Sequence, residues 1–138
     1  MKYQARDAIR VSGLSSRQLD YCIRSGLMLS CGGGGHGFPR GFRLQDLLAL
    51  ALLREVLRAG IPARAVAPAL RLVQRARGLP SLDQLGDTAV WTDGRAATLV
   101  RKGEVARKPT RTISYVLDLG TVAERVNARL QKIAIPAA

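Results

Sequence analysis

Residues 15–26 concentrate side chains that suit contact with nucleic acid. Tyr21 follows Arg17 and Gln18 by four and three positions and precedes Arg24 by three, so a helix would place all four on one face. A guanidinium can bind guanine or phosphate, and a carboxamide can pair with adenine. We therefore expect Arg17 and Gln18 to read base edges, and tyrosine hydroxyls and the other arginine to bind phosphates. The alternative is an ordinary solvated helix face, which has the same polar pattern.

A glycine-rich segment follows. Residues 31–43 read CGGGGHGFPRGFR and include six glycines, which exclude a regular helix and allow the backbone to approach a phosphate closely. We expect a flexible basic loop, and a surface loop without a ligand is the alternative. The full set of residues expected to contact nucleic acid is Ser16, Arg17, Gln18, Tyr21, Arg24, His36, Arg40 and Arg43.

Two short helices must position the first group of side chains. Residues 4–11 have amphipathic helical spacing, and Gly13 ends that helix. Ser15 or Ser16 can cap a second helix, which Gly26 would stop. The expected buried side of this second helix is formed by Leu19, Cys22 and Ile23. This spacing predicts a helix-turn-helix, whose second helix projects polar side chains outward.

A leucine-rich helix is expected over residues 44–59, with Gly60 after its end. It has few polar residues, so most of its circumference must be covered. Pro62 then suits a first helical turn, and Pro68 predicts a kink rather than a complete break in the helix that follows. The apolar face of that helix would consist of Val66, Leu70 and Val73.

The spacing of apolar residues changes from helical to alternating near residues 78–87, which predicts a boundary there. Residues 88–92 and 95–101 are expected to pair as a hairpin. The Asp93-Gly94 dipeptide between them favours a type I′ turn.

Three further features are expected beyond the hairpin. Lys102-Gly103 predicts another reversal, and residues 112–118 predict a strand. Thr121 and Glu124 have the spacing of a capping box, which would open a last helix. One face of that helix would carry Val122, Val126, Leu130 and Ile133.

A basic cluster lies on this second part of the chain and comprises Arg101, Lys102, Arg107, Lys108 and Arg111. Charges of this kind commonly protect a strand edge, which is the interpretation we favour, and a second DNA or RNA contact is the alternative. Trp91 is expected to pack in the small core of this part.

The composition favours an acidic partner. Lys and Arg number 22 against 10 Asp and Glu, a net charge of +12, and 18 of the basic residues are arginine. Nucleic acid is the favoured partner, ahead of an acidic membrane or protein, although a GC-rich genome would also enrich arginine. No apolar run is long enough for a membrane span, and the first residues lack a signal core. We expect a cytoplasmic, nucleoid-associated protein.

The residue types argue against catalysis. The single imidazole is that of His36, and no carboxylate pair or nucleophile with a neighbouring base can be proposed. Cys22 and Cys31 cannot build a disulfide framework or, with one histidine, a tetrahedral zinc site. Gly32, Gly34 and Gly37 match a nucleotide-binding pattern only formally. We expect no enzyme, no cofactor and no metal.

Several of these segments together resemble the MerR family of winged helix-turn-helix regulators. The similar parts are ARDAIRVSGLSSRQLDYCIRSGLM, the Gly/Arg loop, and FRLQDLLALALLREVLRAGIPARAV, which cover roughly the first half of the chain. The resemblance implies that the second helix enters the major groove, that the loop forms a β wing over the phosphate backbone, and that the protein works as a homodimer.

The chain also departs from the family pattern. Asp20 stands where the family usually has arginine, and Cys22 where it usually has a second tyrosine. An acidic side chain that faces phosphates weakens DNA binding unless it pairs with Arg17 or Arg24 or accepts a hydrogen bond from a cytosine amino group. The target sequence should therefore differ from those of typical family members. The C-terminal part is similar to a MerR-like subgroup with a small α/β domain rather than one long dimerisation helix.

These observations predict an α+β protein. Residues 1–77 are expected to form a MerR-type winged helix-turn-helix, and residues 78–87 a linker. Residues 88–138 are expected to form a small domain of a β-hairpin, a strand and a helix, which dimerises or responds to a small-molecule or protein effector. The predicted function is sequence-specific transcription regulation on a pseudo-palindromic double-stranded DNA site. The alternative is an excisionase-like accessory factor that bends DNA in recombination. Neutralising about six phosphates would give a log–log salt slope near −5.

Overall fold

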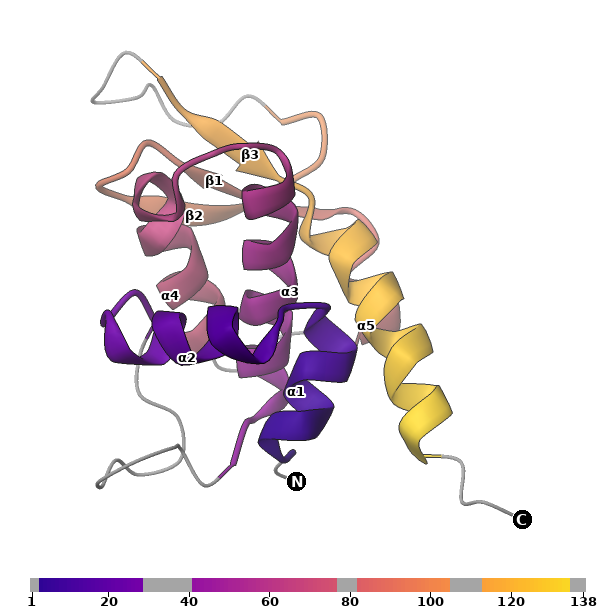
Figure 1. Cartoon of the computed structure of the whole chain (residues 1–138). Coiled ribbons are helices and arrows are strands. Elements are labelled where there is room, and N and C mark those ends of the chain that lie inside the picture. Colours follow the sequence, from indigo (N-terminus) through magenta and orange to yellow (C-terminus); the bar gives the residue numbers. More distant parts are fainter. Residues whose placement is uncertain (1–2, 29–40, 77–81, 105–112, 135–138) are drawn as a thin grey trace.

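The computed structural model describes residues 3–28, 41–76, 82–104 and 113–134. These residues form five α-helices, two short 3-10 helices and a three-stranded antiparallel sheet, which is an α+β fold. The elements follow one another as α1 (Ala5–Ser12), α2 (Ser16–Arg24), α3 (Leu44–Arg58), η1 (Ala63–Val66), α4 (Ala67–Arg75), η2 (Leu82–Gln84), β1 (Thr88–Thr92), β2 (Ala97–Arg101), β3 (Tyr115–Leu117) and α5 (Leu119–Ala134) (Figure 1).

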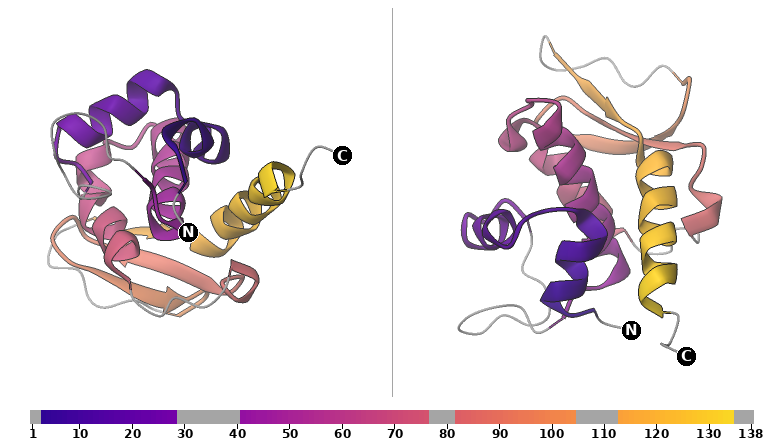
Figure 2. Two further views of the ribbon diagram at one scale, coloured as in Figure 1. Left: turned by 90° about the horizontal axis from the view of Figure 1, so that it is seen from below. Right: turned by 45° about the vertical axis from the view of Figure 1, so that its right-hand side comes forward.

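Helix α3 is the centre of the molecule. Every residue from Leu47 to Leu53 is buried, so the expectation that most of its circumference is covered is confirmed. Helices α1, α4 and α5 all pack against it. Helices α1 and α2 lie on one side of α3 and the sheet lies on the other (Figure 2, left).

The predicted end of the first helix at Gly13 and the predicted serine cap of the second are confirmed. Gly13 has a φ of +81°, a left-handed conformation that glycine adopts without a steric penalty, and its N–H donates to the Ile9 carbonyl at 3.0 Å. Ser15 caps α2, because its hydroxyl accepts from the Gln18 N–H at 3.0 Å. From α5, Arg129 Nη1 donates to the Val11 carbonyl at 2.8 Å, which ties the last helix to the end of the first.

The start of α3 is held by a buried polar cluster. The Asp46 carboxylate accepts from the Arg43 N–H at 2.8 Å and from Gln74 Nε2 of α4 at 2.9 Å. The Arg43 guanidinium also contacts this carboxylate and donates to the Gln74 carbonyl at 3.0 Å. Next to this cluster, Phe42 and Tyr3 exchange two backbone hydrogen bonds. These bonds anchor the chain where it leaves the glycine-rich segment.

The region around Pro68 differs from the prediction. The expected kink is wrong: the chain forms a 3-10 helix, η1, and then a separate α-helix, α4, with Pro68 in its first turn. Proline lacks an N–H and suits the first turn of a helix, where that N–H would have no partner within the helix. Starting a new helix at this point therefore costs less free energy than a kink inside one continuous helix. The predicted face of Val66, Leu70 and Val73 is buried, as expected.

The hairpin is confirmed, but its turn is not of the predicted type. Thr92 pairs with Ala97, which leaves four residues in the loop, and no residue other than glycine has a positive φ in the described ranges. A two-residue type I′ turn is therefore wrong. The Asp93 carboxylate accepts from the N–H groups of Arg95 at 2.9 Å and Ala96 at 3.0 Å and stabilises the wider loop instead.

The last strand and helix begin at other residues than predicted. Strand β3 spans Tyr115–Leu117 and pairs with β1, so the sheet order is β2-β1-β3. The capping box at Thr121 is wrong, because α5 begins at Leu119 and the Asp118 carboxylate accepts from the Thr121 N–H at 2.9 Å. The reversal at Lys102-Gly103 is confirmed, with Gly103 at a φ of +88°.

Residues from both predicted segments contribute to one hydrophobic core. Val90, Leu117, Leu119, Val122 and Val126 belong to the same buried cluster as the leucines of α3. Leu85, inside the predicted linker 78–87, is also buried in it. The division into residues 1–77 and 88–138 thus remains a prediction about chain organisation, and the described parts of the two segments pack together.

A close approach of backbone atoms at Gly120 gives a testable consequence. A β-carbon at this position would lie 2.5 Å from the carbonyl oxygen of Leu85 and closer still to that of Gly86. Gly120→Ala should therefore lower the free energy of unfolding by about 2–3 kcal/mol, because backbone atoms must move apart. The measurement is urea denaturation followed by circular dichroism.

The matched control is Gly86→Ala, because a β-carbon there meets no atom within 4 Å. We expect a change of less than about 0.5 kcal/mol for this control. Equal losses for the two variants would contradict the packing of α5 against the 85–86 turn.

Candidate nucleic-acid interface

The outer face of α2 carries the predicted side chains. Ser16, Arg17, Gln18, Tyr21 and Arg24 are all exposed, and Tyr21 is 61% accessible. The inner side of the helix is held by Leu19 and Cys22, which are buried against the core. Since only this inner side is buried, the helix is firmly packed and still presents its polar side chains to solvent.

Gln18 has a structural role in addition to its exposure. Its side-chain oxygen accepts from the Ser15 N–H at 2.9 Å, while its own N–H donates to the Ser15 hydroxyl, a complete capping box. Bidentate pairing with adenine needs this oxygen as an acceptor. Base reading by Gln18 would therefore compete with the cap of its own helix, a constraint that does not apply to Arg17.

Asp20 pairs with Arg24, as the sequence allowed. Arg24 Nε lies 3.1 Å from Asp20 Oδ1, one turn apart on the surface of α2. Such an exposed pair contributes little to stability. Its consequence is electrostatic, because the one acid of this helix is directed at a neighbouring guanidinium.

Two arginines that the sequence analysis missed lie beside α2. Arg64 of η1 and Arg71 of α4 line a pocket of about 350 Å³ together with Tyr21, Ser25, Gly26 and Leu27. Arg71 Nη2 donates to the Gly26 carbonyl at 2.9 Å, so α4 fixes the turn after α2. These residues are 45 positions apart, and only the packing of α4 on α3 brings them together.

The other predicted contacts divide into two groups. Arg43 is about half exposed, but its guanidinium is held by Asp46 and the Gln74 carbonyl. This interaction stabilises the start of α3 and restricts the reach of Arg43. His36 and Arg40 lie outside the described residues, as does the predicted wing up to residue 40.

The thiol of Cys22 belongs to the core. Burial raises the pKa of Cys22 to about 11, so the thiol is neutral near pH 7 and has little nucleophilic character. Within the described ranges, no three His, Cys, Asp or Glu side chains are close enough to hold a metal ion.

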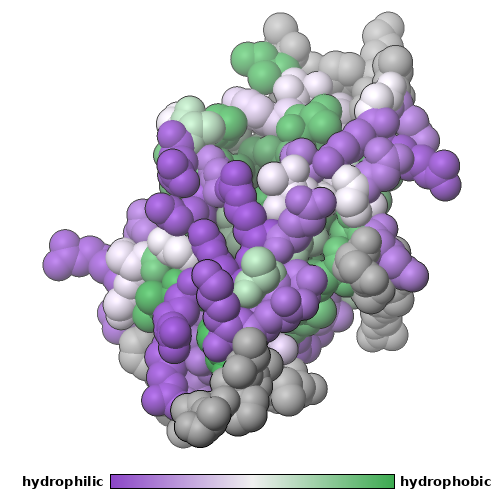
Figure 3. Space-filling model, turned by 90° about the vertical axis from the view of Figure 1, so that its right-hand side faces the viewer, coloured by the Kyte–Doolittle hydropathy of each residue, from purple (hydrophilic) through white to green (hydrophobic). Residues whose placement is uncertain are grey.

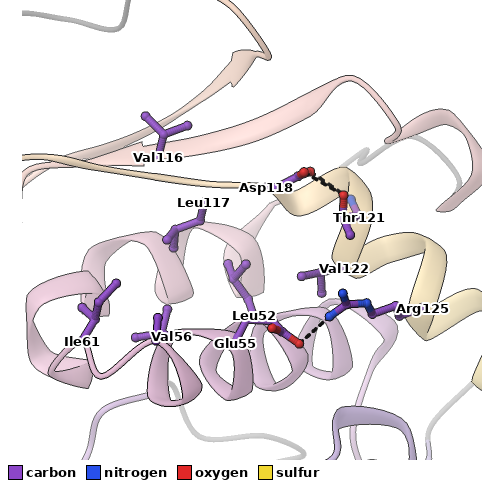
Figure 4. Close-up of a pocket in the computed structure, with 11 residues that line it drawn as sticks. Leu52, Glu55, Val56, Ile61, Val116, Leu117, Asp118, Thr121, Val122 and Arg125 are labelled. Carbon is purple, nitrogen blue, oxygen red and sulfur yellow. Dashed lines mark hydrogen bonds and ion pairs between the residues drawn. The ribbon is translucent and has the colours of Figure 1, made fainter.

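A second concave surface lies between α3, β3 and α5 (Figure 4). This pocket of about 290 Å³ is lined mainly by apolar side chains, including Leu52, Val56 and Leu117. An ion pair between Arg125 Nη1 and Glu55 Oε1, 2.6 Å apart, lies at one side of it. Partial burial acts to raise the pKa of Asp118 beside the pocket, but hydrogen bonds from Lys102 and Thr121 outweigh it and hold that pKa below its usual range.

The surface beside α5 is mostly hydrophilic, with smaller hydrophobic areas between the charged side chains (Figure 3). None of the helices in the described ranges combines the length and apolar character that crossing a membrane requires. Comparison with models of protein families finds no match, and comparison with curated proteins finds no significantly similar sequence.

Proposed function

We propose that the protein is a sequence-specific regulator of transcription that binds double-stranded DNA as a homodimer, through a MerR-type winged helix-turn-helix in residues 1–77. In this proposal α2 enters the major groove and the glycine-rich segment contacts the backbone. Residues 88–138 dimerise or respond to an effector. The protein acts by binding alone, in the cytoplasm at the nucleoid.

The observation that carries the proposal is the shape and charge of the α2 face. A helix packed on one side by Leu19 and Cys22 presents Arg17, Tyr21 and Arg24 on the other. A major groove admits a helix of this kind, and guanidinium groups suit both guanine edges and phosphates.

The neighbouring arginines support the same conclusion. Arg64 and Arg71 lie next to Tyr21, at the C-terminal end of α2. A helix in the major groove has phosphates on both sides, so cations beside the helix can bind the backbone while the helix reads bases. The Asp20–Arg24 pair limits repulsion between the single acid and those phosphates.

The salt dependence of binding tests this assignment. Arg64→Ala should weaken binding to all duplexes alike and reduce the magnitude of the log–log salt slope by about 0.9, the value for one lost phosphate contact. The control is Lys132→Ala, which removes one exposed positive charge from α5. Fluorescence anisotropy of a labelled duplex over a range of salt concentrations measures both variants.

A slope unchanged by Arg64→Ala, or changed equally by Lys132→Ala, would contradict the placement of the backbone contacts around α2. In that case the charge of +12 would act as a general field rather than through this face.

A further inference from the structure

Two pockets of the surface adjoin each other beside α2. The first is the one of about 350 Å³ that Arg64 and Arg71 line, and the second has a volume of about 360 Å³. The side chains of Tyr21, Leu27 and Ala63 line both pockets. Each volume lies at the lower end of the range typical of small-molecule sites. A ligand can therefore extend from one pocket into the other.

The second pocket is mainly apolar. Its lining includes Cys22 of α2 and both Leu53 and Leu57 from the C-terminal half of α3. Five large hydrophobic residues are exposed in the described ranges, and two of them, Tyr21 and Leu57, line this pocket. Exposed apolar side chains that gather in a hollow are typical of a binding site for an apolar group.

The first pocket is cationic. Arg64 is exposed, and Arg71 Nη2 donates to the Gly26 carbonyl at 2.9 Å. The Nε atom of Arg71 is enclosed and has no hydrogen-bond acceptor among the described residues. A buried donor without an acceptor is costly, so such donors are rare in folded proteins. An anion bound by Arg64 and Arg71 would bring the acceptors that the chain does not supply here.

The charges around these pockets are not compensated by acids. None of the described residues that line either pocket is an aspartate or a glutamate. The pocket between α3, β3 and α5 differs, because Glu55 pairs with Arg125 there and Asp118 also lines it (Figure 4). An anionic ligand is therefore favoured beside α2 and not at the other pocket.

We propose that the two adjoining pockets beside α2 form one binding site for an amphipathic anion, a small molecule with an apolar body and one carboxylate, sulfonate or phosphate group. The apolar body lies against Leu53 and Leu57, and Arg64 and Arg71 bind the anionic group. Arg17 and Tyr21 also line the site, so its occupant and a DNA duplex compete for the same face of α2. This competition rests on the proposed function, whereas the site itself does not.

Fluorescence titration with two matched probes tests the site without DNA. Anilinonaphthalene sulfonate has an aromatic body and a sulfonate, and phenylnaphthylamine has the same aromatic body without the sulfonate. The wild-type protein should bind the sulfonate probe at one saturable site and about tenfold more tightly than the neutral probe. The reason is that only the sulfonate accepts charge-assisted hydrogen bonds from the guanidinium groups.

Four variants assign the two ends of the site. Arg64→Gln should weaken the sulfonate probe about fivefold and leave the neutral probe unchanged, and Lys132→Gln, which removes an exposed cation from α5, should change neither. Leu57→Gln should weaken both probes about fivefold, because it places an amide at the apolar end. Leu99→Gln is its control, since Leu99 of β2 is 40% exposed and Leu57 is 37% exposed. Far-ultraviolet circular dichroism verifies that each variant is folded.

Three results would overturn the proposal. The first is equal affinity of the wild type for the two probes, and the second is a sulfonate affinity that Arg64→Gln leaves unchanged. The third is a loss from Leu57→Gln no larger than that from Leu99→Gln. A sulfonate affinity that needs Arg64 but not Leu57 would mean that the cationic pocket takes a phosphate of DNA and that no apolar body binds beside it.

Competition with a DNA duplex separates this site from the proposed function. If both hold, saturating sulfonate probe should weaken duplex binding. A protein that binds the probe in the predicted way but binds no duplex retains the site and refutes the function. A protein that binds the duplex but has no measurable affinity for the probe retains the function and refutes the site. Binding of probe and duplex together, without mutual weakening, would overturn the overlap between them.

Discussion

Asp46→Ala is expected to lower the free energy of unfolding by about 3 kcal/mol, because it removes a buried acceptor from charged and polar partners. The Asp46 side chain is inaccessible to solvent and accepts from the Arg43 N–H and from the buried amide of Gln74. Alanine leaves these donors without this carboxylate and opens a small space between α3 and α4. Asp46→Asn retains one acceptor oxygen and should lower the free energy of unfolding by less than Asp46→Ala does.

Urea denaturation measures the loss, and Asp20→Ala is its control. Asp20 is also an acid paired with an arginine on a helix, but the pair lies at the surface. We expect a change within about 0.5 kcal/mol for this control. If Asp46→Ala were as mild as Asp20→Ala, the cluster could not be what fixes α3 to α4.

Arg17→Ala is expected to weaken binding to the preferred duplex by about 1–3 kcal/mol and to relax the choice of base at one position of each half-site. The proposed function has Arg17 make a bidentate guanidinium contact to guanine, which alanine cannot replace, so alanine would not discriminate among bases there. Arg17 lies on the exposed face of α2, and unlike Gln18 it is not used to cap its helix.

Competition between the preferred and a random duplex measures this effect. Arg17→Ala should reduce the ratio of the two affinities, whereas Arg64→Ala should lower both affinities and leave the ratio unchanged. Equal losses on both duplexes for Arg17→Ala would mean that Arg17 binds phosphate and that another residue reads the bases.

The predictable parts of the structure depend on neighbours in sequence. The Gly13 turn and the cap by Ser15 follow from residues within one helical turn of each other. The burial of α3 likewise follows from the composition of a single segment. Such features are determined by backbone conformation and local hydrogen bonds, which a sequence displays directly.

The missed parts depend on contacts between distant segments. The Asp46–Gln74 bond joins residues 28 positions apart, and the Arg71–Gly26 bond joins residues 45 apart. No local pattern marks Arg71 as a neighbour of α2. The same holds for Arg129, whose contact with the Val11 carbonyl depends on how α5 packs across the molecule.

The wrong predictions arose where the same short segment could form two different patterns of local hydrogen bonds. Asp118 and Thr121 can both cap the last helix, and the buried position of Leu119 favours the earlier start. At the hairpin, Asp93 can either adopt a positive φ or accept backbone hydrogen bonds with its carboxylate, and it does the second. Tertiary packing decides between such alternatives.

Selection of duplexes from a random library tests the central claim most directly, namely that the α2 face binds double-stranded DNA in a sequence-specific way. The proposal predicts enrichment of a pseudo-palindromic motif with half-sites separated by about one helical turn, roughly 34 Å. The folded Arg17→Ala variant should enrich the same motif with less preference at one position of each half-site. Retention of DNA with no enriched sequence, or the same motif at full strength from the Arg17→Ala variant, would contradict the account.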